Sequence, residues 1–190
     1  MMTPKQLIET LAEAGSRQYG DEAVSQLEHA LQCAALANVE DGRPEMVAAA
    51  LFHDVGHLVH KTDRSIVKRG TDDRHELMGG RLLEGWFGPT VFMPVRLHVA
   101  AKRYLCTAEA GYWDILSAAS KRSLEIQGGR FTREEVEAFA QLPYAMEAVQ
   151  LRRWDERAKI AALAVPPLDS YRDLVADVLA PDEPTVVEMA

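Results

Sequence analysis

Cysteine is scarce in this sequence, and long apolar stretches are missing from it. The 190 residues include only Cys33 and Cys106, too few for a framework of disulfides. The longest purely apolar run, residues 46–52, is far shorter than the roughly 18–20 residues that a transmembrane helix needs. The opening Met-Met-Thr-Pro-Lys contains no apolar signal core. We therefore expect a soluble, cytoplasmic protein.

Positive charge is also in short supply. The chain has 21 Lys and Arg against 29 Asp and Glu, which gives a formal net charge of −8. Partners rich in phosphate select basic surfaces, so this balance argues against binding to nucleic acid or to an anionic membrane. The composition, 47% hydrophobic and 26% charged, excludes a disordered or fibrous chain. A globular protein is expected.

Helical patterns occur along almost the whole chain, and almost no segment alternates with the period of two that is typical of a strand. Two capping boxes, Ser25–Glu28 and Thr132–Glu135, each predict the start of a helix. Pro44 predicts another start, because proline is favoured at the first helical position. The expected helices span residues 25–39, 44–58, 75–86, 91–104 with Pro94 in the first turn, 112–124, 132–142, 144–163 and 171–179, and residues 61–73 are expected to form a long loop. The predicted fold class is all-α, with one domain over residues 1–180, a helical bundle, and a frayed tail over residues 181–190.

The histidines carry the clearest chemical signal. There are six of them, His29, His53, His57, His60, His75 and His98. His53 and Asp54 stand in the middle of an apolar helical pattern, where a charged Asp is costly unless a cation or hydrogen bonds compensate it. Imidazole and carboxylate are natural ligands for iron, manganese or zinc, so a metal site is predicted here. His57 follows His53 by one helical turn, which places both rings on the same helix face, whereas His60 is expected to have no role in the site.

His29, the pair His53-Asp54 and the late Asp155 resemble the His…His-Asp…Asp signature of the HD-domain superfamily. Its members are all-α proteins that hold one or two metals between helices, and most of them are phosphohydrolases. The resemblance covers nearly the whole chain, from about Tyr19 to Asp155. It implies that metals lie between the central helices of the bundle.

Three further features resemble a rarer branch, the HD-domain mixed-valent di-iron oxygenases. This branch includes myo-inositol oxygenase and the oxygenase that cleaves 2-amino-1-hydroxyethylphosphonate to glycine and phosphate. His75 and His98 add two candidate ligands to the signature. Residues 117–129 resemble the Leu-Ser-x-x-Ser…Leu-x-x-Gln-Gly-Gly stretch of these oxygenases. Tyr19 and Glu22 stand where the phosphonate-cleaving oxygenase carries a Tyr-x-x-Glu lid.

The resemblance implies two iron ions, one Fe(II) and one Fe(III), with O2 as co-substrate and a small phosphonate as substrate. One iron would be held by His29, His53, Asp54 and Asp155, and the other by Asp54, His75 and His98. Tyr19 would occupy the second iron at rest, and Glu22 would point toward the cationic end of the substrate. The expected reaction cleaves the C–P bond of a 1-hydroxy-2-aminoethylphosphonate-type substrate, with a primary or N-trimethylated amine, and gives phosphate and glycine or glycine betaine.

A pocket for the anionic end of a substrate is predicted from the residues themselves. Lys102 and Arg152 each lie about one helical turn from a candidate metal ligand, so each shares a helix face with that ligand. With the His57 ring and the Ser120 hydroxyl, they supply the donors that bind a tetrahedral anion.

Other functions stay open at this point. An HD phosphohydrolase acting on a nucleotide or a phosphomonoester would also use metals, Lys102 and Arg152, although it has no use for a lid tyrosine. A non-catalytic binding module is disfavoured, because all six candidate ligand positions are filled. The sequence does not separate a primary ammonium from a trimethylammonium substrate, and it leaves the oligomeric state open.

Overall fold

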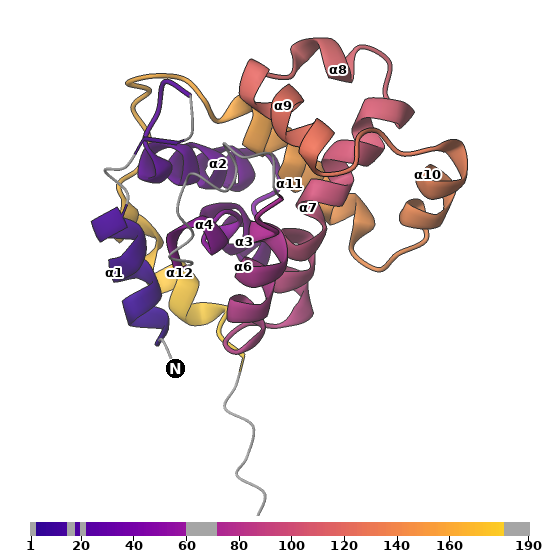
Figure 1. Ribbon diagram of the computed structural model, residues 1–190. Helices are drawn as coiled ribbons and strands as arrows, with labels where there is room; N and C mark the ends of the chain where they lie inside the picture. Colours follow the sequence, from indigo (N-terminus) through magenta and orange to yellow (C-terminus); the bar gives the residue numbers. More distant parts are fainter. Residues whose placement is uncertain (1–2, 15–17, 20–21, 60–71, 181–190) are drawn as a thin grey trace, which may run out of the picture.

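The computed structural model in Figure 1 describes residues 3–14, 18–19, 22–59 and 72–180. Its elements are α1 (Pro4–Ala14), α2 (Gln26–Glu40), α3 (Pro44–Phe52), α4 (Gly56–Val59), α6 (His75–Glu84), α7 (Pro89–Ala108), α8 (Tyr112–Ile115), α9 (Ala118–Ile126), α10 (Arg133–Ala140), α11 (Ala145–Arg157), the 3₁₀ helix η1 (Leu168–Tyr171) and α12 (Arg172–Asp177). Within these ranges, β pairing is limited to isolated bridges between Gln18 and Ser25 and between Phe87 and Leu179. The all-α prediction is confirmed.

Helix α3 lies at the centre, where it packs against α2, α7 and α11. Every residue from Met46 to Phe52 is buried, so this helix is apolar on all sides rather than along one stripe. Helices α1 and α12 lie on one flank of this group, and α6 packs against α7 (Figure 1). The resulting core includes Phe52, Phe87 and Trp154. This central position of α3 places the residues at its C-terminal end deep inside the protein.

A second apolar cluster lies beside the first, among α8, α9, α10 and parts of α7 and α11 (Figure 1). Leu105 and Cys106 of α7 contribute to this cluster, whereas Val91 and Val95 of the same helix contribute to the core around α3. Because α7 and α11 extend through both clusters, side chains near their middles lie between the two apolar regions.

Both capping boxes are confirmed at the starts of α2 and α10. Helix α1 was not among the predicted helices. Other helix boundaries differ from the prediction. Local hydrogen bonds start or end these helices at residues where the periodicity of apolar residues gives no signal. Ser117 caps α9 through its side chain and splits the expected helix 112–124 into α8 and α9. Pro89 follows the N-cap Gly88 and starts α7 early, so Pro94 lies inside the helix rather than in its first turn.

The expected continuous helix 44–58 is interrupted after Phe52. Residues 53–55 form a tight turn in which the Val55 and His57 amides donate to carbonyls three residues back, at 3.0 Å each, instead of four. Asp54 therefore lies in a turn between α3 and α4 and not in mid-helix. This turn directs His53 and Asp54 into the centre of the molecule, where both are buried.

Glycine is required at the start of α4. A Cβ on Gly56 would lie 2.0 Å from the carbonyl oxygen of His75 and 3.0 Å from the Gly79 nitrogen. The backbones of α4 and α6 consequently approach more closely than side chains permit. This contact fixes His75 relative to Asp54.

Helix α11 ends at Arg157 and does not continue to residue 163 as expected. Ala158 leaves the helix, and its carbonyl accepts a hydrogen bond from the Nδ1 atom of His29 at 2.7 Å. His60, most of the expected loop 61–73 and the expected tail 181–190 lie outside the described residues. No helix in the described part of the chain is long and apolar enough to cross a membrane.

Candidate metal centre

The predicted ligands come together between α2, α6, α7, α11 and the turn after α3. They form two groups whose ligand atoms lie within 4.8 Å of one another, His29 with His53 and Asp155, and Asp54 with His75 and His98. All six side chains are buried. The Nε2 atoms of His29 and His53 are 3.1 Å apart, and those of His75 and His98 are 3.2 Å apart.

Asp54 faces both groups with different oxygen atoms. Its Oδ2 lies 3.6 Å from His53 Nε2 and 3.9 Å from His29 Nε2. Its Oδ1 lies 3.4 Å from His75 Nε2 and 3.6 Å from His98 Nε2. A carboxylate in this position can bridge two metal ions.

All four histidines turn the same ring nitrogen, Nε2, toward the centre. The Nδ1 atom of each donates to an oxygen atom at 2.7–2.9 Å, for His29 the carbonyl of Ala158, for His53 that of Ala50, for His98 that of Val95 and for His75 the carboxylate of Asp73. A carbonyl oxygen accepts only, so these rings carry their proton on Nδ1 and turn the Nε2 lone pair inward. Lone pairs facing one another at about 3 Å need a cation between them.

The carboxylates point to the same conclusion. Asp54 Oδ2 and Asp155 Oδ1 are buried oxygens without a hydrogen-bond partner among the described residues. Burial raises the pKa of Asp155, but Arg152 and His29 outweigh it and hold that pKa well below the ordinary range. Burial and the neighbouring His75 together lower the pKa of His98 to about 3. The centre therefore contains ionised carboxylates at Asp54 and Asp155 and a neutral imidazole at His98, which are the forms that bind a metal. Burial lowers the pKa of His75, but Asp73 and Asp54 outweigh it and raise that pKa above its ordinary value.

Tyr19 lies against the first group. Its ring stacks on His29 with centroids 4.1 Å apart, and its hydroxyl donates a hydrogen bond to Asp54. Burial, Asp54 and Asp155 raise the pKa of the phenol well above its ordinary value. The Tyr19 amide donates to the Val24 carbonyl at 2.9 Å, which anchors this segment before α2. The structure thus brings the predicted lid tyrosine to the shared carboxylate, but against His29 of the first group, whereas the resemblance implied a place on the second iron.

Glu22 lies farther along the same segment. Its carboxylate accepts a hydrogen bond from the Ser117 hydroxyl at 2.6 Å and lies 3.6 Å from the ammonium of Lys159. The residue predicted to meet a substrate cation therefore already has a cationic neighbour in the protein.

Of the four donors predicted to bind an anion, Arg152 and Ser120 contact each other, whereas His57 contacts Asp73 and His75 instead. Arg152 is shared between several acceptors. The buried Arg152 guanidinium donates to Asp155 and Glu156, and it also donates to the Ser120 hydroxyl at 3.3 Å. Lys102 is buried and donates to Ser123 at 2.8 Å. Burial lowers the pKa of Lys102 to about 7, and Arg152 contributes to that shift. Arg152 thus orients the candidate metal ligand Asp155 and also contacts Ser120.

His57 lies beside His75, a candidate ligand of the second group. Its ring stacks on His75 with centroids 3.8 Å apart. Its Nδ1 donates to Asp73 at 3.0 Å, while the other oxygen of Asp73 accepts from His75 at 2.9 Å. Asp73 thus fixes two rings at once.

Sequence reasoning missed three residues of this site. Asp73 belongs to none of the motifs, although its place two residues before His75 was a usable signal. Glu156 accepts from Arg152, Lys159 and Ser120, yet nothing in the sequence separates it from other helix carboxylates. Lys159 follows Asp155 by four residues, the same spacing that singled out Lys102 after His98.

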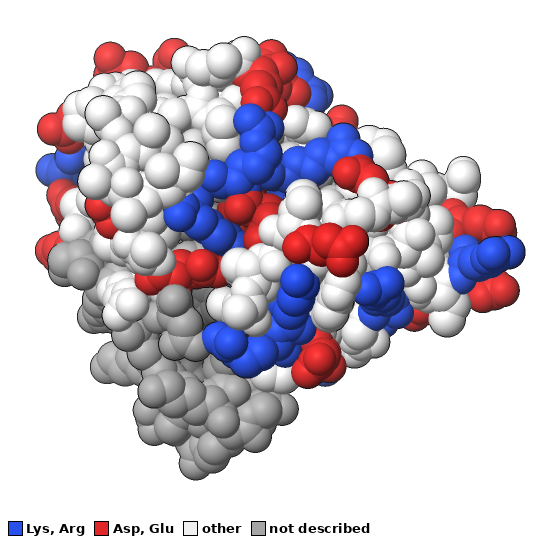
Figure 2. Space-filling view, turned by 90° about the horizontal axis from the view of Figure 1, so that it is seen from above, with Lys and Arg blue, Asp and Glu red and all other residues white. Residues whose placement is uncertain are grey.

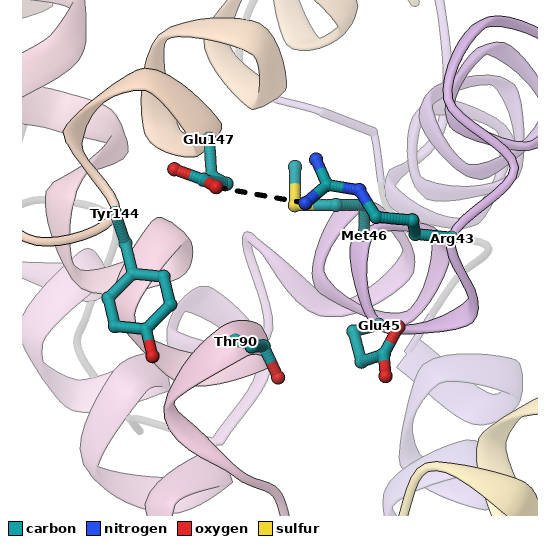
Figure 3. A pocket seen from close by; sticks show the side chains of 6 residues that line it. All are labelled: Arg43, Glu45, Met46, Thr90, Tyr144 and Glu147. Carbon is teal, nitrogen blue, oxygen red and sulfur yellow. Dashed lines mark ion pairs between the residues drawn. The ribbon is translucent and has the colours of Figure 1, made fainter.

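The surface shows where charge gathers. Figure 2 shows Lys and Arg side chains near the middle of the face seen from above, with acidic side chains between them. A surface pocket elsewhere is drawn in Figure 3 and is lined by Arg43, Glu45, Met46, Thr90, Tyr144 and Glu147. Arg43 and Glu147 form an ion pair of 3.7 Å there. None of the predicted site residues lines this pocket, so it is separate from the metal centre.

Comparison with known proteins agrees with this geometry. No family model matches the chain. A hydroxymethylphosphonate dioxygenase of Gimesia maris is 45% identical over 174 residues, which cover 91% of this chain and 86% of that protein. The glycine-betaine-forming [1-hydroxy-2-(trimethylamino)ethyl]phosphonate dioxygenase of Leisingera caerulea is 38% identical over 153 residues, 80% of this chain and 78% of that protein. Uncharacterized protein L432 of Acanthamoeba polyphaga mimivirus is 32% identical over 177 residues, 92% of this chain and 80% of that protein. Likeness of this extent shows that the chain belongs to the phosphonate dioxygenase family, within the HD-domain oxygenases that its motifs resemble.

Proposed function

We propose that this protein is a di-iron oxygenase that uses O2 to cleave the C–P bond of a 1-hydroxyphosphonate. The observation that carries the proposal is the pair of buried His and Asp groups that share Asp54. Two relatives with names of phosphonate dioxygenases support the same reaction class.

The donor set fits two iron ions. We assign one ion to His29, His53, Asp54 and Asp155, and the other to Asp54, His75 and His98. Imidazole nitrogen with carboxylate oxygen is a ligand set that iron accepts, and Asp54 Oδ2 and Asp155 Oδ1 have no hydrogen-bond partner among the described residues. The metals would supply redox chemistry and Lewis acidity, while the protein fixes their positions and excludes other chemistry.

The protein's own residues would hold the substrate. Lys102, Ser120 and Arg152 would bind the phosphonate oxygens, since these groups donate from one side of the centre. His57 would lie beside the reacting carbon, held by Asp73. Tyr19 would cover the centre until substrate arrives. Its stack on a candidate ligand favours an oxygenase over the alternative phosphohydrolase.

The reaction balances with one O2 for each substrate. The hydroxyl-bearing carbon becomes a carboxylate and the phosphonate becomes inorganic phosphate, with one oxygen atom added to each product and no external reductant. With a 2-amino or 2-trimethylammonio substituent the carboxylate product is glycine or glycine betaine. The name of the Gimesia maris relative adds hydroxymethylphosphonate, which has no nitrogen, to the candidate substrates.

Aerobic incubation of the iron-loaded protein with these three phosphonates tests the proposal. We expect release of phosphate with equal uptake of O2 for at least one of them, and no release by Asp54→Ala. Phosphate release from phosphomonoesters without O2 uptake would show a hydrolase instead.

A further inference from the structure

Lys159 occupies a fixed position beside the metal centre, just after the end of α11. The preceding carbonyl, of Ala158, accepts from His29. The following residue, Ile160, is bound by the side-chain amide of Gln32, which donates to its carbonyl at 2.7 Å and accepts from its amide at 3.0 Å. Both neighbours of Lys159 are thus tied to α2, the helix that carries a candidate ligand.

The ammonium of Lys159 links Ser120, a donor of the predicted anion pocket, to the segment that carries Tyr19. It donates to the Ser120 hydroxyl and to Glu156, at 3.0 Å each, and it lies 3.6 Å from Glu22. Its side chain is only 10% exposed and that of Glu22 is 15% exposed, so water screens this pair weakly. Lys159 is therefore positioned to offset the negative charge of Glu22.

This charge matters for substrate choice. A phosphonate held by the pocket around Ser120 would lie near Glu22, because Lys159 contacts both. A substrate with an ammonium or trimethylammonium group would have to share Glu22 with the Lys159 ammonium, and like charges at short range repel one another. A substrate without a cationic group meets no such competition.

We propose that Lys159 is a specificity-determining residue, which lowers the preference of the site for 1-hydroxyphosphonates with a cationic substituent relative to those without one. The inference rests on the proposed function, since it assumes that these phosphonates bind at the metal centre. It assigns the effect to the charge of Lys159 acting on Glu22 and not to a contact with the phosphonate alone.

The test compares hydroxymethylphosphonate with 1-hydroxy-2-aminoethylphosphonate. For each enzyme, kcat/KM is measured with both, and their dissociation constants are measured by calorimetry without O2. In Lys159→Met we expect the preference for the amino substrate over hydroxymethylphosphonate to rise about tenfold by both measures. Lys159→Arg, which keeps the charge, should stay within about threefold of the parent. Glu22→Gln added to Lys159→Met should reverse the rise.

Lys121→Met is the matched control. It removes one positive charge next to Ser120, but the Lys121 ammonium lies over the Trp113 ring, 5.5 Å from its centroid. We expect the parent preference in this variant. If Lys159→Met lowered kcat/KM and weakened binding equally for both substrates, the preference would be unchanged and the inference would be overturned. Absence of product from the parent enzyme would refute the proposed function, but the ratio of the two dissociation constants would still decide the inference about Lys159. If neither phosphonate bound, that inference would be overturned as well.

Discussion

At the scale of single residues, Lys102 combines a cost in stability with its proposed role in binding the phosphonate. Burial lowers its pKa in the folded protein to about 7, whereas an unfolded lysine titrates at about 10.4. Between these values the unfolded chain binds more protons, so the free energy of unfolding should rise with pH from 7 toward 10. Below pH 7 both states are protonated and this contribution no longer changes.

Lys102→Met should remove that dependence. We expect the parent's free energy of unfolding to rise from pH 7 to 9 more steeply than the variant's, by up to about 1.4 kcal/mol for each pH unit. Urea titrations of the metal-free proteins at pH 7, 8 and 9 measure it, and equal slopes would contradict the assigned pKa. The kcat/KM of the variant should also fall, by the equivalent of roughly 2–4 kcal/mol of transition-state stabilisation. The reason is that a bound phosphonate would lose one partner of a desolvated charge pair.

Asp73 holds two histidine rings, His75 and His57, through contacts that the sequence alone does not show. One oxygen accepts from His75 and the other from His57, so an amide in its place would lose one of these bonds. We expect Asp73→Asn to weaken metal binding about 10–100-fold, the usual cost of losing an outer-shell carboxylate. Asp72→Asn, whose parent side chain accepts from the Arg74 amide at 3.2 Å, is the control. Equal metal retention by both variants after dialysis would exclude the role of Asp73.

The six ligand candidates could be predicted because each needs a rare residue type at a motif position. Glu156 and Lys159 could not be found in the same way, since charged residues are common on protein surfaces and only the fold shows that these two side chains are no more than 10% exposed. The sequence placed Glu22 near the substrate through the resemblance alone. Its pairing with Lys159 depends on a contact between residues 137 positions apart, which local patterns do not encode.

At the scale of elements, capping residues gave the starts of α2 and α10 correctly, because a capping box acts within four residues. Periodicity misjudged the turn after Phe52 and the end of α11. In both places, tertiary contacts end the helix. The carbonyl of Ala158 serves His29 instead of continuing α11, and the turn after Phe52 directs Asp54 toward both His groups.

The contact between α4 and α6 gives a prediction at this scale. In Gly56→Ala the new methyl group would overlap the His75 carbonyl, so α6 must shift and move His75 away from Asp54. We expect a loss of roughly 1–3 kcal/mol in the free energy of unfolding, together with weaker metal binding. In the control Gly85→Ala, the new methyl group would have its nearest neighbour at 3.5 Å, so the change should stay within about 0.5 kcal/mol. Urea denaturation and metal analysis decide between them, and equal stability of the two variants would contradict the close approach.

At the scale of the whole molecule, the metal centre connects parts of the chain that the two apolar clusters hold separately. Its ligand candidates come from α2, the turn after α3, α6, α7 and α11, and the last two helices extend through both clusters. Four inward-facing imidazoles and two ionised carboxylates are unfavourable together without cations. Metal binding should therefore stabilise the folded chain as well as equip it for chemistry, because the unfolded chain has no preformed site.

The two groups should respond differently to loss of a ligand. Asp54→Ala removes the carboxylate that faces both groups, so we expect it to lose both metal ions and most of the rise in Tm that iron produces in the parent. His98→Ala removes a ligand from one group only, so it should keep about one ion for each chain and part of that rise. Anaerobic iron loading followed by metal analysis and thermal unfolding measures both quantities, with metal-free samples of each variant as the reference for changes in packing. A parent that binds a single ion would rule out the shared carboxylate, because there would be no second ion to share it. An Asp54→Ala variant that still binds two ions would rule it out as well, because neither group would then depend on Asp54.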